Sequence, residues 1–430
     1  MNFLVAANGF GRPSALLGSS LLYMELNHTN TSVERYEFGN NQIHRFVLRR
    51  DGSEIKTSVD ANGSSDFDSA WLKSSEIISY LPAHKTIRLA DLFCGTGPMT
   101  LGVVEAGKAL NINIEPMFAI DFEANASKNY ALNFPSANVV TDDINNIING
   151  GIGTSKTDEE LNLIKKIGSI DFMIAGPPCQ GHSDLNNHTR RNDPRNLLIF
   201  KACRFIEIFR PKYFIIENVQ GIRHDKNHTL DDTKKLLTSW GYHLSEHLLM
   251  ASKYGVAQNR RRFLLVGSID KIEVDTSLYE VKQPRGVMWA IGDMIDKYNP
   301  DSIFNSSATH SAINQKRIDY LFQNNLHELP YQQRPKCQQS PNNRYTSVYG
   351  RMYEDLPAPT ITSGFGSVGQ GRFCHPTCRR TLTPHEAARV QFIPDKFIFD
   401  NSLTRVALQK MIGNAVPPKL TYIIGLELLR

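Results

Sequence analysis

Short apolar runs and segments of helical spacing alternate along the middle of the chain. Four segments with apolar residues at helical spacing predict helices at 98–110, 123–134, 158–167 and 196–209. Each follows or precedes a short apolar run that predicts a buried strand, and these runs are 86–93, 116–121, 138–141, 171–176 and 212–218. Because strand and helix follow one another in strict order, we expect an α/β fold with a doubly wound, mostly parallel sheet.

The pattern changes on both sides of this region. Two further strands are expected within 242–256 and 260–268, after which polar clusters and prolines leave one clear helix, at 311–325. We therefore expect a smaller, irregular domain at 270–379, set into a catalytic and cofactor-binding domain that comprises 85–269 and 380–430. Residues 1–84 are rich in Asn, Ser and Gly, with one plausible strand near 43–50, and form an N-terminal extension of unknown role.

Composition excludes several classes of protein. With 430 residues, 41% hydrophobic and 21% charged, the chain has an ordinary globular composition. No apolar run near its start is long enough to span a bilayer and no basic segment precedes one, so we expect a cytoplasmic protein without a membrane partner. The six cysteines lie far apart and predict reduced thiols, with neither a disulfide framework nor a metal site.

Charge is unevenly distributed. The net charge is +5, and residues 285–380 hold 11 Lys and Arg against 7 Asp and Glu, which makes +4 for that quarter of the chain. A mild basic bias of this kind is compatible with a polyanionic partner, but a solvated basic face would look the same.

Polar and glycine residues at the ends of the first three strands suggest a cofactor site. The stretch "DLFCGTGPMTLG" leaves the first strand and opens a helix, so Gly95 and Gly97 would let the backbone approach a ligand at the helix N-terminus. A plain tight turn would also use these glycines. Asp121 ends the second strand, where a carboxylate can accept hydrogen bonds from ribose hydroxyls, and Asp143 follows the third. The set suggests an adenosine-containing cofactor.

A second set of residues could carry the chemistry. Cys179 lies in "AGPPCQGHS", just beyond the fourth strand, where it is either a nucleophile or a buried structural cysteine. Glu217 ends the next strand and could donate a proton or form an ion pair. In "QNRRRF", Arg260 and Arg262 are expected on one face of a strand, suited to a phosphate or a carbonyl oxygen.

Together these blocks resemble a known family. "DLFCGTG", "GPPCQGHS", "ENV", "QNRRR", "RTLTPHEAARVQFIPD" and "IGNAVPP" occur in the order and spacing of the cytosine-5 DNA methyltransferases of bacterial or phage type, over residues 86 to 430. The resemblance implies a Rossmann-like fold and methyl transfer from S-adenosyl-L-methionine to carbon 5 of a cytosine that is flipped out of duplex DNA.

The resemblance also implies a role for each residue. Cys179 would add to carbon 6 of the base, Glu217 would protonate ring N3, Arg262 would hold the base carbonyl oxygen and Arg260 a backbone phosphate. The implied cofactor contacts are Phe93, Gly95, Gly97, Asp121, Phe122, Asp143, Pro178, Leu198, Asn414 and Val416.

The implied partner is double-stranded DNA, recognised in the major groove by the irregular domain. We expect a monomer. The recognition sequence stays open, as does the question of whether a cognate restriction endonuclease accompanies the enzyme.

The sequence departs from the family at Pro98, His182 and His385, where Gly, Phe and Arg are usual. None of these changes removes a catalytic group. The cluster of Cys374, His375 and Cys378 lacks a fourth ligand, so a structural role is expected.

Two other functions remain as alternatives: a tRNA cytosine-5 methyltransferase, since one branch of the family acts on RNA, and a non-catalytic DNA-binding protein. A nicotinamide oxidoreductase would explain the glycine turn but none of the later blocks.

Overall fold

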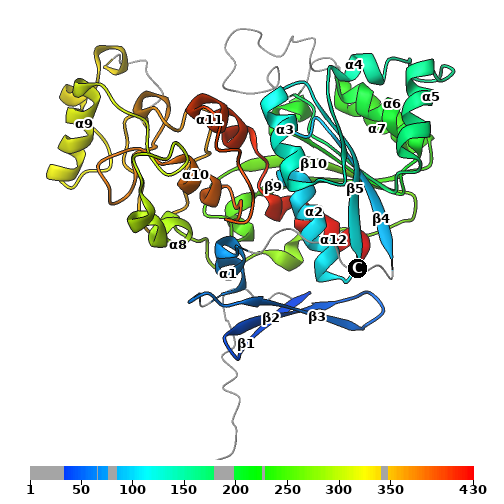
Figure 1. The fold of residues 1–430 in the computed structure, drawn as a ribbon, viewed down its shortest axis with the longest axis horizontal. Coiled ribbons are helices and arrows are strands. Elements are labelled where there is room, and N and C mark those ends of the chain that lie inside the picture. The colour runs from blue at the N-terminus through cyan, green and yellow to red at the C-terminus, as the bar shows by residue number, and fades with distance from the viewer. Residues whose placement is uncertain (1–32, 65, 76–84, 179–197, 225–227, 340–346) are drawn as a thin grey trace, which may run out of the picture.

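A seven-stranded sheet with helices on both faces forms one half of the molecule (Figure 1). The structure is a computed structural model that describes residues 33–64, 66–75, 85–178, 198–224, 228–339 and 347–430. The strand order is β6-β5-β4-β7-β8-β10-β9. The strands are β4 (Thr86–Leu92), β5 (Asn113–Asp121), β6 (Asn138–Thr141), β7 (Phe172–Ala175), β8 (Tyr213–Asn218), β9 (His243–Met250) and β10 (Arg261–Ser268).

The sheet is parallel except for β10, which runs antiparallel to both of its neighbours. The link from β9 to β10 is too short for the crossover that parallel pairing needs, so these two strands pair as a hairpin. The mostly parallel sheet and all seven expected strands are confirmed.

Each face of the sheet has its own apolar core. On one face lie α2 (Pro98–Ala109), α3 (Ala124–Asn133) and α12 (Pro418–Leu429), and on the other α4 (Ile144–Ile147), α5 (Asp158–Ile167), α6 (Ile199–Phe209) and α7 (Thr229–Ser239). Neighbouring residues of β4 serve different cores: Leu89 packs in the first and Ala90 in the second. Helices α2 and α12 can approach closely because Gly102 has no side chain. A Cβ built there would lie 2.1 Å from the Pro418 carbonyl oxygen.

The N-terminal extension packs into the first core. It forms an antiparallel sheet of β1 (Glu34–Gly39), β2 (Gln42–Leu48) and β3 (Glu54–Asp60), followed by α1 (Phe67–Lys73). Ile43 and Val47 are buried in the same cluster as α2 and α12, and the buried Arg45 donates a hydrogen bond from Nη1 to the Tyr422 hydroxyl at 3.0 Å. The extension therefore supports the C-terminal helix instead of hanging free of the main fold.

The segment between β10 and α12 forms the other half of the molecule and has little regular structure (Figure 1). Its helices are α8 (Val287–Ile291) and α9 (Ala312–Gln323), and the chain returns to the sheet through α10 (Pro384–Val390) and α11 (Arg405–Asn414). Ile318, Leu321 and Leu329 belong to a small separate core, whereas Val287 and Ile291 pack in the main one. Among the described residues, no helix has both the length and the apolar character needed to cross a membrane.

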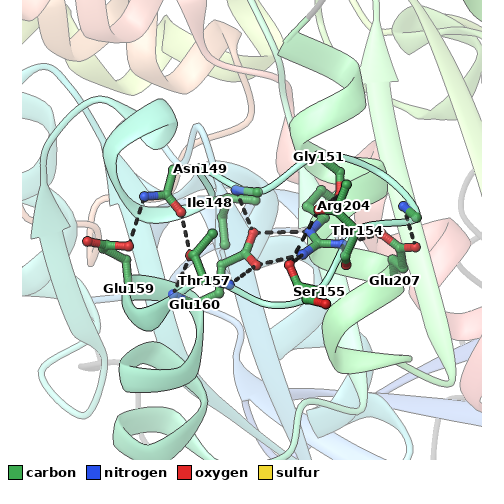
Figure 2. A network of polar contacts seen from close by, with 12 residues as sticks. Ile148, Asn149, Gly151, Thr154, Ser155, Thr157, Glu159, Glu160, Arg204 and Glu207 are labelled. Carbon is green, nitrogen blue, oxygen red and sulfur yellow. Dashed lines mark hydrogen bonds and ion pairs between the residues drawn. The ribbon is translucent and has the colours of Figure 1, made fainter.

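A buried ion pair joins α5 to α6 on the second face of the sheet (Figure 2). Arg204 Nη2 lies 2.7 Å from Glu160 Oε2, and Arg204 also donates hydrogen bonds to the Thr154 and Ser155 carbonyls. Glu160 completes a capping box with Thr157 at the start of α5. The network fastens α6, the helix that begins next to Leu198, to the loop that follows α4.

Replacing Arg204 with methionine is expected to lower the free energy of unfolding by about 3–5 kcal/mol, because Glu160 would stay buried without its partner. Urea unfolding measures this, with the exposed Lys165→Met on α5 as a control that should change stability by less than about 0.5 kcal/mol.

The pH dependence of protein stability gives a second check of the ion pair between Glu160 and Arg204. Burial raises the pKa of Glu160, but hydrogen bonds from Arg204, Thr157 and Gly150 outweigh it and lower that pKa. The stabilisation is therefore present above the pKa of an unfolded glutamate, about 4.3, and is lost as the pH falls through the lowered value. If Arg204→Met were as stable as the wild type at pH 7, the ion pair between Arg204 and Glu160 would not stabilise the fold as we expect.

Candidate active site

The carboxyl ends of β4, β7 and β8 bring two of the predicted groups of residues together. Gly176, directly after β7, donates its N–H to the Leu92 carbonyl at 3.0 Å. A Cβ built on Gly176 would lie 3.8 Å from the Phe93 carbonyl oxygen and 3.8 Å from Glu217 Oε2. The glycine turn after β4 and the carboxylate at the end of β8 therefore flank one residue at the same edge of the sheet.

The turn after β4 has a backbone shaped for close approach. Phe93, Gly95 and Gly97 all have positive φ angles, of 58°, 53° and 95°. A side chain at Gly97 would come within 2.5 Å of Phe134 and 2.8 Å of Tyr130, so glycine is required there. Pro98 occupies the first position of α2, where its missing N–H costs no helical hydrogen bond, and this departure from the family therefore fits the turn.

Asp121 holds this turn from the neighbouring strand. Its Oδ2 accepts a hydrogen bond from Gly95 N at 2.8 Å, and its Oδ1 accepts one from Glu123 N at 2.9 Å. Burial raises the pKa of Asp121, although these two N–H groups oppose the shift. Phe122 follows with 63% of its surface exposed, and Asp143 caps α4 by accepting from Asn145 N at 2.9 Å. An exposed aromatic ring thus stands next to the glycine turn.

Asp91, the first residue of the same motif, was not singled out from the sequence. It is fully buried and accepts a hydrogen bond from Thr100 Oγ1 at 2.7 Å, and the Thr100 hydroxyl lies 2.9 Å from that of Tyr130. Burial raises the pKa of Asp91 well above its usual range. A carboxylate between the apolar residues Ala90 and Leu92 was the available signal, and its contacts show that it ties β4 to the first turn of α2.

Glu217, which is buried, pairs with the partly buried Arg262. Arg262 Nε lies 2.7 Å from Glu217 Oε1, without meeting the geometry of a hydrogen bond. The two residues approach because β10 pairs antiparallel with β8, and Leu264 lies opposite Glu217. Burial raises the pKa of Glu217, while Arg262 and Arg260 oppose the shift. The site therefore holds a carboxyl group that keeps its proton to higher pH than an exposed glutamate does.

Arg260 has protein partners where a phosphate contact was predicted. Its guanidinium is buried and donates to the Ile361 carbonyl at 2.7 Å and to the Gly413 carbonyl at 3.0 Å. Gln258, also buried, accepts a hydrogen bond from Ile361 N at 2.9 Å. Arg260 lies just before β10, so it does not share a strand face with Arg262 as the sequence suggested. These contacts enclose the Arg260 guanidinium between two C-terminal segments.

The C-terminal block reaches the same edge of the sheet. Asn414 ends α11 and is exposed, whereas Val416 is buried between α11 and α12. Thr421 in α12 donates its hydroxyl to the Met99 carbonyl at 2.9 Å, which attaches this block to the first turn of α2. Pro178 and Leu198 border a stretch outside the described residues, and Cys179 and His182 lie in that stretch.

The other residues noted in the sequence have structural contacts. His385 lies between Asn305 Oδ1 and Asp395 Oδ1, each 2.8 Å from a ring nitrogen. His375 Nδ1 accepts hydrogen bonds from the N–H groups of Thr377 and Cys378. Within the described ranges, no three His, Cys, Asp or Glu side chains are grouped so that they could hold a metal ion, and Cys94, Cys203, Cys374 and Cys378 are free thiols.

The chain is similar to known proteins over most of its length. The family described as C-5 cytosine-specific DNA methylase matches residues 87–430. Type II methyltransferase M1.BsuMI of Bacillus subtilis is 43% identical over 411 residues, which cover 93% of this chain and 96% of that protein. Type II methyltransferase M.DdeI of Desulfomicrobium norvegicum is 29% identical over 380 residues, covering 78% and 86%.

A solved structure shares the fold. It is a DNA modification methyltransferase encoded within an E. coli prophage, with a TM-score of 0.55 and 23% identity, and the match covers 80% of this chain and 98% of that one. This likeness agrees with the doubly wound sheet described above.

Proposed function

The chain belongs to the C-5 cytosine-specific DNA methylase family and is a DNA (cytosine-5) methyltransferase, and we propose that it acts on double-stranded DNA with S-adenosyl-L-methionine as methyl donor. The observation that carries the proposal is the position of Glu217, paired with Arg262, on the other side of Gly176 from the glycine turn. A proton donor for the base and a cradle for a cofactor thus lie at one edge of the sheet.

The residues of the turn suit S-adenosyl-L-methionine. Gly95 and Gly97 expose backbone at the start of α2, Asp121 lies within hydrogen-bonding distance of that turn, and Phe122 offers an exposed ring for an adenine to stack on. We propose that Phe93, Asp143, Pro178, Leu198, Asn414 and Val416 complete the cofactor site. When bound, the cofactor supplies a methyl group activated by its positive sulfonium.

The protein's own residues prepare the base. Cytosine must leave the duplex to be reached, and carbon 5 becomes nucleophilic only after something adds to carbon 6. We assign that addition to the Cys179 thiolate, since a thiolate and not a thiol is the attacking species. Glu217 donates a proton to N3 as the adduct forms, and Arg262 holds the carbonyl oxygen of the base. Once carbon 5 carries the methyl group, loss of the carbon 5 proton, elimination of the Cys179 thiolate and return of the N3 proton to Glu217 restore the aromatic ring and the starting state of the enzyme.

Arg260 contributes by holding two backbone segments together and not by contacting the substrate. By holding the Ile361 and Gly413 carbonyls together, it fixes the segment after residue 358 against α11, whose last residue is Asn414. We propose that this contact positions the C-terminal part of the cofactor site.

Methyl transfer can be tested directly. Purified protein is incubated with methyl-labelled S-adenosyl-L-methionine and either mixed-sequence duplex DNA or tRNA, and the modified base is identified. Label on carbon 5 of cytosine in DNA is expected, and bisulfite sequencing of a plasmid from expressing cells would give the target sequence. Label confined to tRNA, to adenine N6 or to cytosine N4 would overturn the proposal.

We also propose that the enzyme is a cytoplasmic monomer whose target sequence is shared with a cognate restriction endonuclease. The Type II names of its relatives support the second point. Light scattering after size exclusion tests the first. Cleavage of unmethylated but not methylated plasmid by an endonuclease from the same cells tests the second.

Replacing Phe122 with alanine is expected to raise the KM for S-adenosyl-L-methionine about tenfold, because stacking of a base on an aromatic ring contributes about 1–3 kcal/mol. The melting temperature should not change, since the ring is 63% exposed. Val406→Ala, which removes an apolar side chain that is 74% exposed on α11, is the control. An unchanged KM in Phe122→Ala would exclude stacking on this ring.

A further inference from the structure

Helix α1 lies between the two halves of the molecule (Figure 1). We propose that α1 holds both ends of the segment that recognises DNA and fixes them to the cofactor-binding block, with Asp68 as the central positioning residue. The inference rests on the proposed function and on the expectation, implied by the family resemblance, that residues 270–379 recognise the target sequence. It gives the N-terminal extension, which carries no motif, a part in target selection.

Asp68, in the first turn of α1, joins two distant segments. One carboxylate oxygen lies 2.6 Å from Arg285 Nη1 and the other 2.9 Å from Lys419 Nζ, and all three side chains are largely buried. Burial raises the pKa of Asp68, but Lys419 and Arg285 outweigh it and lower that pKa, so the carboxylate stays charged. Arg285 lies just before α8, in the first part of the recognition segment, and Lys419 follows Val416 of the cofactor block by three residues.

Asp66 adds a second connection between α1 and the recognition segment. As the N-cap of α1, it accepts a hydrogen bond from Ser69 N at 2.9 Å. Its other oxygen accepts one from Trp289 Nε1 at 2.9 Å, and Arg285 Nη2 lies 3.3 Å from Oδ1. The Arg285 guanidinium also lies 4.1 Å from the centre of the Trp289 ring. Two carboxylates at the start of α1 therefore bind Arg285 and Trp289 in the first part of the recognition segment.

The far end of α1 holds the place where that segment returns. The Leu72 carbonyl accepts a hydrogen bond from Asp395 N at 2.8 Å, and Trp71 stacks on Phe392 with ring centres 5.4 Å apart. Phe392 and Asp395 belong to "RTLTPHEAARVQFIPD", the block after the recognition segment. The chain thus leaves and rejoins the catalytic half against a single seven-residue helix.

This arrangement has a consequence for selectivity. Little regular structure lies between the two ends, so their anchorage decides where the recognising loops stand relative to Glu217 and the flipped base. Loosening α1 should therefore weaken DNA binding and blur the choice of target, whereas cofactor binding and Glu217 itself are left intact.

Two variants test the proposal. Asp68→Asn removes the charge that Arg285 and Lys419 share, and Trp289→Phe removes one hydrogen bond to Asp66 while it keeps an aromatic ring under Arg285. Asp51→Asn, in the exposed β2–β3 turn of the same extension, is the matched control. For each protein we would measure the melting temperature, the Kd for S-adenosyl-L-methionine, kcat and KM with plasmid DNA, and the methylated positions by bisulfite sequencing.

Asp68→Asn is expected to raise the KM for DNA about tenfold and to methylate cytosines outside the wild-type target, with kcat at saturating DNA changed less than about threefold. Trp289→Phe should shift the same quantities less, and Asp51→Asn not at all. A stability defect alone would not change which cytosines are methylated.

If Asp68→Asn does not fold, Trp289→Phe decides. Folded variants with wild-type KM for DNA and wild-type target choice would overturn this inference and leave the proposed function standing. A wild-type protein that methylates no DNA would overturn both.

Discussion

Replacing Cys179 with serine is expected to abolish methyl transfer, with a loss of at least about four orders of magnitude in kcat. The reaction needs an addition to carbon 6, and at neutral pH a hydroxyl is far less ionised than a thiol and a much poorer nucleophile. Cys179 lies outside the described residues; in the sequence it follows Pro178, shortly after the end of β7, and β7 is the strand between β4 and β8. Labelled methyl incorporation into DNA over several hours measures the loss.

Two further measurements separate a chemical defect from a folding defect. Cys378→Ser, which changes a partly exposed thiol outside the site, should keep wild-type activity. On duplex DNA that contains 5-fluorocytosine, the wild-type protein should form a covalent adduct that depends on the cofactor, and Cys179→Ser should form none while it still melts cooperatively and binds the cofactor. Adduct formation by Cys179→Ser would rule out this cysteine as the nucleophile.

Sequence periodicity predicted the central sheet well because strands such as β7 and β8 are buried at every position and because helices separate most of its strands. It missed most of the N-terminal sheet for a physical reason. Residues of β3 alternate between partly buried and exposed, with none fully buried, so the strand has no apolar stripe to detect. Helix α1 has only seven residues, too few for a helical period to stand out. What stabilises them is contact with other segments. Trp71 of α1 stacks on Phe392, and β3 pairs with β2, whose Arg45 donates a hydrogen bond to Tyr422.

The candidate site shows the same division. Motifs identified Glu217 and Arg262, and the strand order put the turn after β4 near them, since ligands collect at the carboxyl ends of parallel strands. The partners of Arg260 could not be predicted, because Ile361 and Gly413 lie more than a hundred residues away and offer backbone carbonyls, which carry no sequence signal. The same holds for the pairing of Asp68 with Arg285 and Lys419.

Replacing Glu217 with glutamine is expected to lower kcat by about 10²–10⁴-fold, the usual contribution of a general acid. Glutamine has nearly the same shape and still offers an oxygen to Arg262, but it has no acidic proton to give to N3. Burial raises the pKa of Glu217, so in the wild-type enzyme kcat should fall as the pH rises past that pKa, whereas the residual rate of Glu217→Gln should lack this decline. Rates on saturating plasmid DNA between pH 5 and 9 measure both.

The same substitution should lower kcat but raise the stability of the folded protein relative to the wild type as the pH increases. Because the folded pKa of Glu217 is raised, the folded protein keeps a proton that the unfolded chain has already released. The contribution of Glu217 to stability is therefore fully present below the unfolded pKa, about 4.3, and is lost as the pH rises through the folded value. Glutamine does not ionise, so the stability of Glu217→Gln relative to the wild type should increase across that window in urea unfolding.

Glu246→Gln is the control, since it makes the same change on the outer strand β9, where the side chain pairs with Lys234. It should retain wild-type kcat at every pH. A Glu217→Gln enzyme with kcat within about threefold of wild type would exclude proton donation by this residue, because a true general acid contributes far more. The combined result expected, a slower enzyme that gains relative stability as the pH rises, follows from one cause: burial of a carboxyl group that the reaction needs protonated.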